Sequence, residues 1–176
     1  MFRKQWPAFL LAFVAPLVAV FWWWGGFSKV DISSGEAGPY RFVYLEHQGD
    51  IADARKTQKK VFDALKHADL EPGDNMLMLL TDPRTTPKTQ QRAKAGYTVG
   101  LKGTVPKGLK EEVIFRRRVL MARVKAGILI APSKAYQALH DYLKPAGQDI
   151  RMPTLEIYRA GQSVAQVGEL TVEMER

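Results

Sequence analysis

The sequence predicts an α+β domain in which a βαββ unit is duplicated, giving one antiparallel sheet with two helices on one face, preceded by one transmembrane helix. Three observations support this prediction: an uncharged apolar stretch at the N-terminus, alternating strand-like and helix-like segments after it, and a constant spacing between the two halves. The chain has 176 residues, 46% hydrophobic and 25% charged, which suits one folded domain. It contains no cysteine, which excludes disulfides and thiolate metal sites.

Residues 1–29 are expected to form a signal-anchor that crosses a membrane once. Residues 5–28 carry no charged side chain, and about 20 apolar residues are enough to cross a bilayer as a helix, so the span is expected at 6–27. Arg3 and Lys4 precede this stretch, and the positive-inside rule therefore places the N-terminus in the cytoplasm and the domain in the periplasm or another extracytoplasmic space. The stretch ends in bulky residues where a signal peptidase needs small ones, which favours an uncleaved anchor.

Residues 30–39 are expected to be a turn-rich tether, and residues 40–176 the domain. The expected first repeat, about 40–103, contains a strand, a helix and two strands at 40–49, 50–69, 75–82 and 96–103. The expected second repeat, about 117–172, has the same order at 118–127, 132–144, 152–160 and 164–172. A constant shift of 78 residues, which places Gly49 on Gly127, indicates an internal repeat.

The alternation along two central strands predicts which side chains face the helices. The residues expected to face the helices are Leu77, Leu79, Leu155 and Ile157. The residues expected on the opposite face, near the junction of the two repeats, are Met76, Met78, Leu80, Glu156 and Tyr158. That second set is too apolar for a plainly exposed surface, so this face is expected either to be covered or to form a groove.

Four short motifs carry a resemblance to a known family. They are HQG at 47–49, TDPRTTP at 81–87, QRAKAGYTV at 91–99 and LEIYRAG at 155–161. With these motifs in this order, residues 38–172 resemble the GyrI-like superfamily, also called the gyrase-inhibitor-like or AraC effector-binding domain. The expected anchor followed by this domain is also similar to the arrangement in an animal autophagy receptor of the endoplasmic reticulum.

The resemblance implies that the groove between the repeats binds a small, amphipathic or cationic molecule without catalysis. It implies that Glu156 contacts this ligand, and the other candidate ligand-binding residues are Tyr158, Met78, Tyr44, Leu80 and Tyr97. A carboxylate among aromatic rings attracts a cation by charge and by the ring quadrupole. The chain departs from the family in having Asp50 and Ile51 where a Pro-Tyr pair is common, so one aromatic side chain expected in the groove is absent.

Other interpretations of the same residues remain open. Glu156 taken alone is better suited to a solvated or salt-bridged strand position, and each tyrosine is as well suited to ordinary sheet packing. A small hydrolase could use Glu156, although hydrolase members of the family need a tryptophan, and all four tryptophans here precede residue 25. A protein-interaction module could use the basic faces, and anionic lipid could contact a basic helix face made of Arg55, Lys56, Lys59 and Lys60. No nucleic acid, cofactor or metal is expected, because DNA-binding relatives carry a helix-turn-helix before this domain and the three histidines are scattered.

Overall fold

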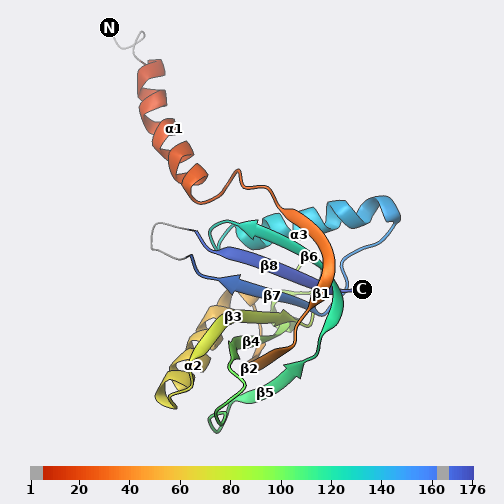
Figure 1. The fold of residues 1–176 in the computed structure, drawn as a ribbon. Coiled ribbons are helices and arrows are strands. Elements are labelled where there is room, and N and C mark those ends of the chain that lie inside the picture. Colours follow the sequence, from red (N-terminus) through yellow and green to blue (C-terminus); the bar gives the residue numbers. More distant parts are fainter. Residues whose placement is uncertain (1–5, 162–166) are drawn as a thin grey trace.

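The computed structural model describes residues 6–161 and 167–176, which form one eight-stranded antiparallel sheet and three α-helices (Figure 1). The strands are β1 (Asp31–Ala37), β2 (Tyr40–Gln48), β3 (Pro72–Leu79), β4 (Arg92–Val99), β5 (Lys110–Ile114), β6 (Arg117–Lys125), β7 (Thr154–Arg159) and β8 (Glu169–Glu175). The α-helices are α1 (Trp6–Trp23), α2 (Ala54–His67) and α3 (Ala131–Leu143), and the short 3₁₀ helices are η2 (Ile51–Asp53), η3 (Lys88–Gln90) and η4 (Lys144–Ala146). The strand order in the sheet is β1-β6-β8-β7-β3-β4-β2-β5.

The sheet curls so that its two ends approach each other. Strands β1 and β2 lie near opposite ends of the strand order, yet only Gly38 and Pro39 connect them. The Tyr40 hydroxyl on β2 also reaches across to donate a 2.7 Å hydrogen bond to Glu173 on β8. The curled sheet therefore encloses an interior face, and the buried cluster on it consists of Phe42, Tyr44, Met76, Met78, Ile114, Leu155 and Ile157. This face is covered by the sheet itself rather than forming a groove.

Helices α2 and α3 cover the outer face of the sheet, one over each half (Figure 1). Their buried residues recur at three- and four-residue spacing, which places them on one helix face; they are Ala54, Gln58, Val61 and Leu65 in α2, and Ala131, Ala135, Leu139 and Leu143 in α3. Leu65 and Leu139 are fully buried, so truncating either to alanine is expected to cost about 2–5 kcal/mol. Between the two helices, strands β3 and β7 contribute to the floor of a cavity.

The two faces of β7 are the reverse of those expected. Leu77 is paired with Glu156, and Met76 with Ile157, so Glu156 lies on the helix-covered face beside Leu77. Leu155 and Ile157, which were expected under the helices, instead point into the curled interior. A slip of one residue moves every side chain of a strand to the other face. Here both faces are covered, so the apolar pattern alone could not specify the register.

The expected fold class is wrong in its number of elements and in its membrane helix. Residues 31–37, expected as a tether, form β1 beside β6, and the unexpected strand β5 pairs with β2. Of the strand expected at 164–172, the part at 164–166 lies outside the described residues, and β8 begins at Glu169.

The expected membrane-spanning segment at residues 1–29 is also wrong. Within the part of the chain that the structure describes, no helix has both the length and the apolar character needed to cross a bilayer. Helix α1 has 18 residues, which at about 1.5 Å each extend about 27 Å, less than the roughly 30 Å of a hydrocarbon core. The expected single-pass membrane localisation, with the domain outside the cytoplasm, is therefore overturned together with the anchor.

Candidate ligand-binding site

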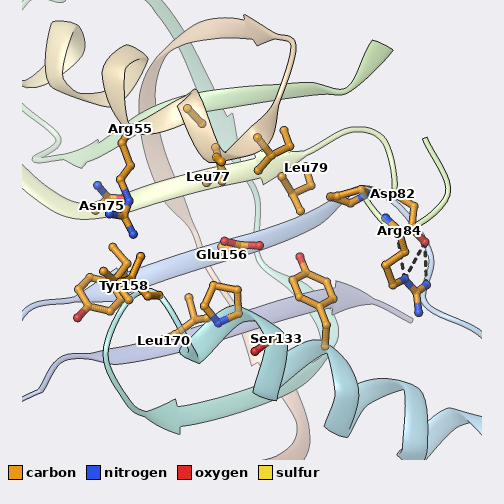
Figure 2. A pocket seen from close by; sticks show the side chains of 18 of the residues that line it. Arg55, Asn75, Leu77, Leu79, Asp82, Arg84, Ser133, Glu156, Tyr158 and Leu170 are labelled. Carbon is orange, nitrogen blue, oxygen red and sulfur yellow. Dashed lines mark hydrogen bonds and ion pairs between the residues drawn. The ribbon is translucent and has the colours of Figure 1, made fainter. Parts of the chain in front are cut away.

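A cavity of about 790 Å³ lies between α2 and α3, above the outer face of β3 and β7 (Figure 2). Ligand sites commonly measure roughly 300–1,000 Å³ and combine apolar walls with few polar groups. The apolar walls are formed by Ile51, Ala52, Ala54, Leu77, Leu79, Pro83, Ile128, Leu129, Pro132 and Leu170. The polar and aromatic groups are Arg55, Gln58, Asn75, Asp82, Arg84, Ser133, Tyr136, Gln137, His140, Glu156 and Tyr158. Both halves of the sheet thus contribute to one site.

Glu156 lies in the middle of the cavity floor, between Leu77 on β3 and Val172 on β8 in the strand register (Figure 2). Its side chain is half-buried and makes no ion pair among the described residues. Burial raises the pKa of Glu156 from its ordinary value of 4.5 to about 7, and hydrogen bonding with Tyr136 opposes this rise only in part. The carboxyl group is therefore easily protonated, and a positively charged neighbour would favour its ionised form.

Tyr136 reaches the floor of the cavity from α3. Its hydroxyl lies 2.7 Å from the hydroxyl of Thr154, a fully buried residue on the same strand as Glu156. Burial, and next the charge of Glu156, raise the pKa of Tyr136 well above its ordinary value, so the phenol stays neutral and keeps its proton available for donation. Tyr136 thus contributes both a ring and a hydroxyl group beside the carboxylate.

Asp82 and Arg84 close one end of the cavity (Figure 2). The Arg84 guanidinium donates to Asp82 at 2.7 Å and to Asp149 at 3.2 Å, and His140 Nδ1 lies 3.5 Å from the same Asp149. The hydrogen bond from Arg84 lowers the pKa of Asp82 below its ordinary value. Each of these groups already has a partner within the protein, so this end of the cavity offers a ligand no unpaired charge.

A polar corner, defined as Arg55, Gln58 and Asn75, forms the other end of the cavity. Gln58 donates from Nε2 to Asn75 Oδ1 at 2.7 Å, and Asn75 donates from Nδ2 to the Tyr97 hydroxyl at 3.3 Å. The amide groups are thereby fixed in orientation. Arg55 projects from the first turn of α2, is exposed to solvent, and makes no ion pair in the described part of the chain.

The structure brings only part of the expected site together. Glu156 and Tyr158 line the cavity, whereas Met78 and Tyr44 are buried in the curled interior and Leu80 packs against the same interior cluster. Tyr97 lies on the outer face but packs against Phe62, with ring centroids 5.6 Å apart, and only its hydroxyl approaches the polar corner.

Sequence reasoning missed the contributions of Tyr136, Arg55 and the two amides. Tyr136 shares the apolar face of α3 with Leu139, and that spacing was the one available signal that it points toward the sheet. The sequence suggests that Arg55 belongs to a basic helix face that contacts anionic lipid. In the structure, Lys56 and Lys59 of that face instead form exposed ion pairs with Asp53 and Asp63. No group of three or more metal-binding side chains occurs in the described ranges.

Solved structures show which fold this arrangement belongs to. The C-terminal domain of EcmrR matches with a TM-score of 0.64 and 14% identity over 83% of this chain and 96% of that one. The structure of SAV2435 bound to tetraphenylphosphonium matches with a TM-score of 0.56 and 9% identity over 82% and 93% of the two chains. An integron cassette protein from Vibrio cholerae matches with a TM-score of 0.52 and 9% identity over 84% and 97%.

The chain has the same overall fold as the EcmrR C-terminal domain and SAV2435. The resemblance seen in the four sequence motifs is thereby supported at the level of fold. Neither a family model nor a curated protein matches the sequence. At identities this low, the comparisons establish the fold, and the ligand has to be argued from the cavity.

Proposed function

We propose that this chain binds a small hydrophobic or amphipathic molecule with a positive charge in the cavity between α2 and α3, without catalysing a reaction. The observation that supports the proposal most strongly is Glu156, a half-buried carboxylate on an apolar floor with no cationic partner in the described chain. A charged group in such surroundings is costly unless it is paired, and a ligand cation would supply the pair. The related fold of SAV2435, solved with tetraphenylphosphonium, is consistent with this class of ligand.

Aromatic rings beside the carboxylate favour the same ligand class. Tyr136 and Tyr158 both line the cavity, and a cation near a ring face gains roughly 0.5–2 kcal/mol depending on how dry the site is. Leu77, Leu79 and Leu170 offer apolar surface to the hydrophobic part of the ligand. The cavity therefore has a charge, rings and apolar walls within one enclosure.

Binding without catalysis fits the groups available around Glu156. Ser133 donates its hydroxyl to the Ile130 carbonyl at 3.0 Å, as a helix-terminal residue does, and His140 is beside Asp149 rather than beside a nucleophile. A serine nucleophile needs a base within hydrogen-bond reach, and among the described cavity residues Ser133 has no such bond to His140.

Calorimetric titration of the full chain with tetraphenylphosphonium tests the proposal. Wild type is compared with Glu156→Gln, which keeps the size of the side chain, and with Glu175→Gln, which removes an exposed carboxylate from the end of β8. We expect Glu156→Gln to weaken binding about tenfold, which corresponds to about 1.4 kcal/mol, and Glu175→Gln to leave it unchanged. Equal affinity in wild type and Glu156→Gln would contradict the proposal.

The affinity measured in this titration should depend on pH through the ionisation of Glu156. Because the pKa of Glu156 is about 7, we expect affinity for the cation to rise between about pH 6 and about pH 8 as the carboxyl group ionises. Glu156→Gln should bind weakly and with no such rise, whereas the Glu175→Gln control should keep the wild-type profile.

A further inference from the structure

Two charged side chains of the cavity are left without a partner in the described chain, and they have opposite signs. Asp82 and Arg84 are paired with each other, which removes both from consideration. The remaining two are Glu156, on the floor, and Arg55, at the polar corner. They come from different elements, β7 and the first turn of α2, and they do not form an ion pair with each other.

The polar corner contains one group, Arg55, that is suited to an anionic hydrogen-bond acceptor. The guanidinium of Arg55 carries five N–H donors in a planar fork that matches a carboxylate or phosphate group. Gln58 is buried and fixed by its bond to Asn75, and Asn75 in turn is held by Tyr97. Figure 2 shows Arg55 and Asn75 together above one end of the floor, with Glu156 at its centre.

From this arrangement we infer that the ligand is amphoteric, with a cationic hydrophobic centre over Glu156 and an anionic oxygen group, such as a carboxylate, held by Arg55. This inference rests on the proposed function and narrows its ligand class. One ligand would then satisfy both charges at once and fill the apolar space between them. A purely cationic ligand would leave Arg55 unmatched and would meet a second positive charge at the mouth of the site.

The two charges are expected to contribute unequally. Glu156 is half-buried, whereas Arg55 is exposed to solvent, and exposed ion pairs are weakened by water and salt. The cationic centre should therefore decide whether a molecule binds, and the anionic group should decide which of several hydrophobic cations binds better. Arg55 is in this sense a specificity residue.

Two matched probes separate the contributions. Carboxybutyl-triphenylphosphonium carries a cation and a carboxylate, and its methyl ester carries the same cation without the negative charge. We expect wild type at about pH 8 to bind the acid about three- to fivefold more tightly than the ester, the size typical of an exposed ion pair. Arg55→Gln should lose this preference, and it should bind the ester at least as tightly as wild type does, because a positive charge that repels the cation has been removed.

Two further variants complete the test. Lys60→Gln removes an exposed cation of α2 that does not line the cavity, and it should keep the preference for the acid. Glu156→Gln should weaken both probes by a similar factor. If wild type binds both probes equally, or if the preference survives in Arg55→Gln, the amphoteric ligand is refuted although cation binding through Glu156 still stands. If neither probe binds wild type, both this inference and the proposed function fail.

Discussion

Two glutamates on neighbouring strands of the same sheet differ in their partners: one is part of the fold, and the other is the carboxylate of the proposed ligand site. Glu173 on β8 points into the curled interior, is 2% exposed, and accepts hydrogen bonds from Arg117 at 2.9 Å and from Tyr40 at 2.7 Å. Glu156 on β7 points to the outer face, into the cavity, and has no cationic partner in the described chain. Both are withdrawn from water, but only the first has its charge compensated by the protein.

Burial alone therefore does not distinguish a carboxylate that is available to a ligand from a structural one. The interior pair links Tyr40 on β2 with β8, so it helps to hold the two ends of the sheet together. Burial, and next the hydrogen bond to Glu173, raise the pKa of Tyr40 to about 12, so the phenol remains a donor at any ordinary pH. The cavity carboxylate lacks such a set of partners, and this deficit is what a ligand can satisfy.

Replacing the interior carboxylate of Glu173 should change folding stability more than replacing Glu156 or Asp63. Glu173→Gln leaves the guanidinium of Arg117, whose side chain is only 17% exposed, without a counter-charge, and we expect a loss of about 3 kcal/mol of folding stability. Urea unfolding monitored by circular dichroism measures this loss as a lower midpoint.

A double variant tests the reason for that loss. Replacing both charges, as Arg117→Met with Glu173→Leu, should restore much of the stability, because no unpaired buried charge remains. An unchanged midpoint in Glu173→Gln would show that this carboxylate does not stabilise the fold and would remove one side of the comparison.

Replacing Glu156 should instead increase folding stability, by an amount that depends on pH. The pKa of Glu156 is about 7 in the folded chain and ordinarily 4.5, so the folded state prefers the protonated form. Below about pH 4.5, Glu156 is protonated in both the folded and the unfolded chain and does not reduce the stability of the fold. As the pH rises from there toward about 7, the unfolded chain ionises first, and the free energy of unfolding falls. Glu156→Gln should therefore be more stable than wild type by about 1–3 kcal/mol at about pH 8 and equally stable near pH 4.

Unfolding of both proteins at several pH values measures this difference, and all other titrating groups cancel between them. A constant difference across the pH range would contradict the raised pKa of Glu156. A destabilised Glu156→Gln at about pH 8 would mean that the carboxylate has a partner in the protein after all.

A smaller change in stability is expected at Tyr136, whose hydroxyl group partly opposes the rise in the pKa of Glu156. In Tyr136→Phe, the buried Thr154 hydroxyl loses its 2.7 Å partner, which should cost about 1 kcal/mol. The same change removes the hydrogen bonding that lowers the pKa of Glu156, so the midpoint of the pH-dependent cation binding should move to higher pH. A lower affinity with an unmoved midpoint would assign Tyr136 to packing alone.

The smallest effect belongs to a third kind of carboxylate. Asp63 pairs with Lys59 at 2.8 Å on the surface of α2, and the two side chains are 47% and 74% exposed. Asp63→Asn should change the stability by less than about 0.5 kcal/mol, within the range of exposed pairs. Together with the two glutamates, this aspartate completes a series in which the energetic weight of a carboxylate follows its burial and its partners.

Much of the local structure could be predicted from the sequence, because it depends on neighbouring residues. The helices expected at 50–69 and 132–144 overlap α2 and α3, since apolar residues recur at helical spacing in both. The strand pattern and the family motif also make Glu156 the central candidate, and the structure places it in the cavity lining, while its role in binding stays a prediction.

The long-range arrangement could not be predicted. The direction of Glu156 depends on a register between β3 and β7 that two covered sheet faces leave unspecified. Strand β1 reads as a tether because its sequence, with Ser33, Ser34 and Gly35, carries turn-forming residues, and it becomes a strand by pairing with β6. The hydrogen bond between Tyr136 on α3 and Thr154 on β7 joins two separate elements, so no pattern within either segment could predict it.

Whether a cation binds beside Glu156 can be tested by following the titration of its carboxyl group. Carbon-13 NMR of labelled glutamate side chains, assigned with Glu156→Gln, gives the pKa of this group in the free protein and with tetraphenylphosphonium present. We predict a pKa of about 7 without ligand and a clear fall when the cation binds, since a positive charge nearby favours the ionised form. A pKa that is unchanged by saturating cation would show that the ligand does not reach Glu156, and it would contradict the proposed site.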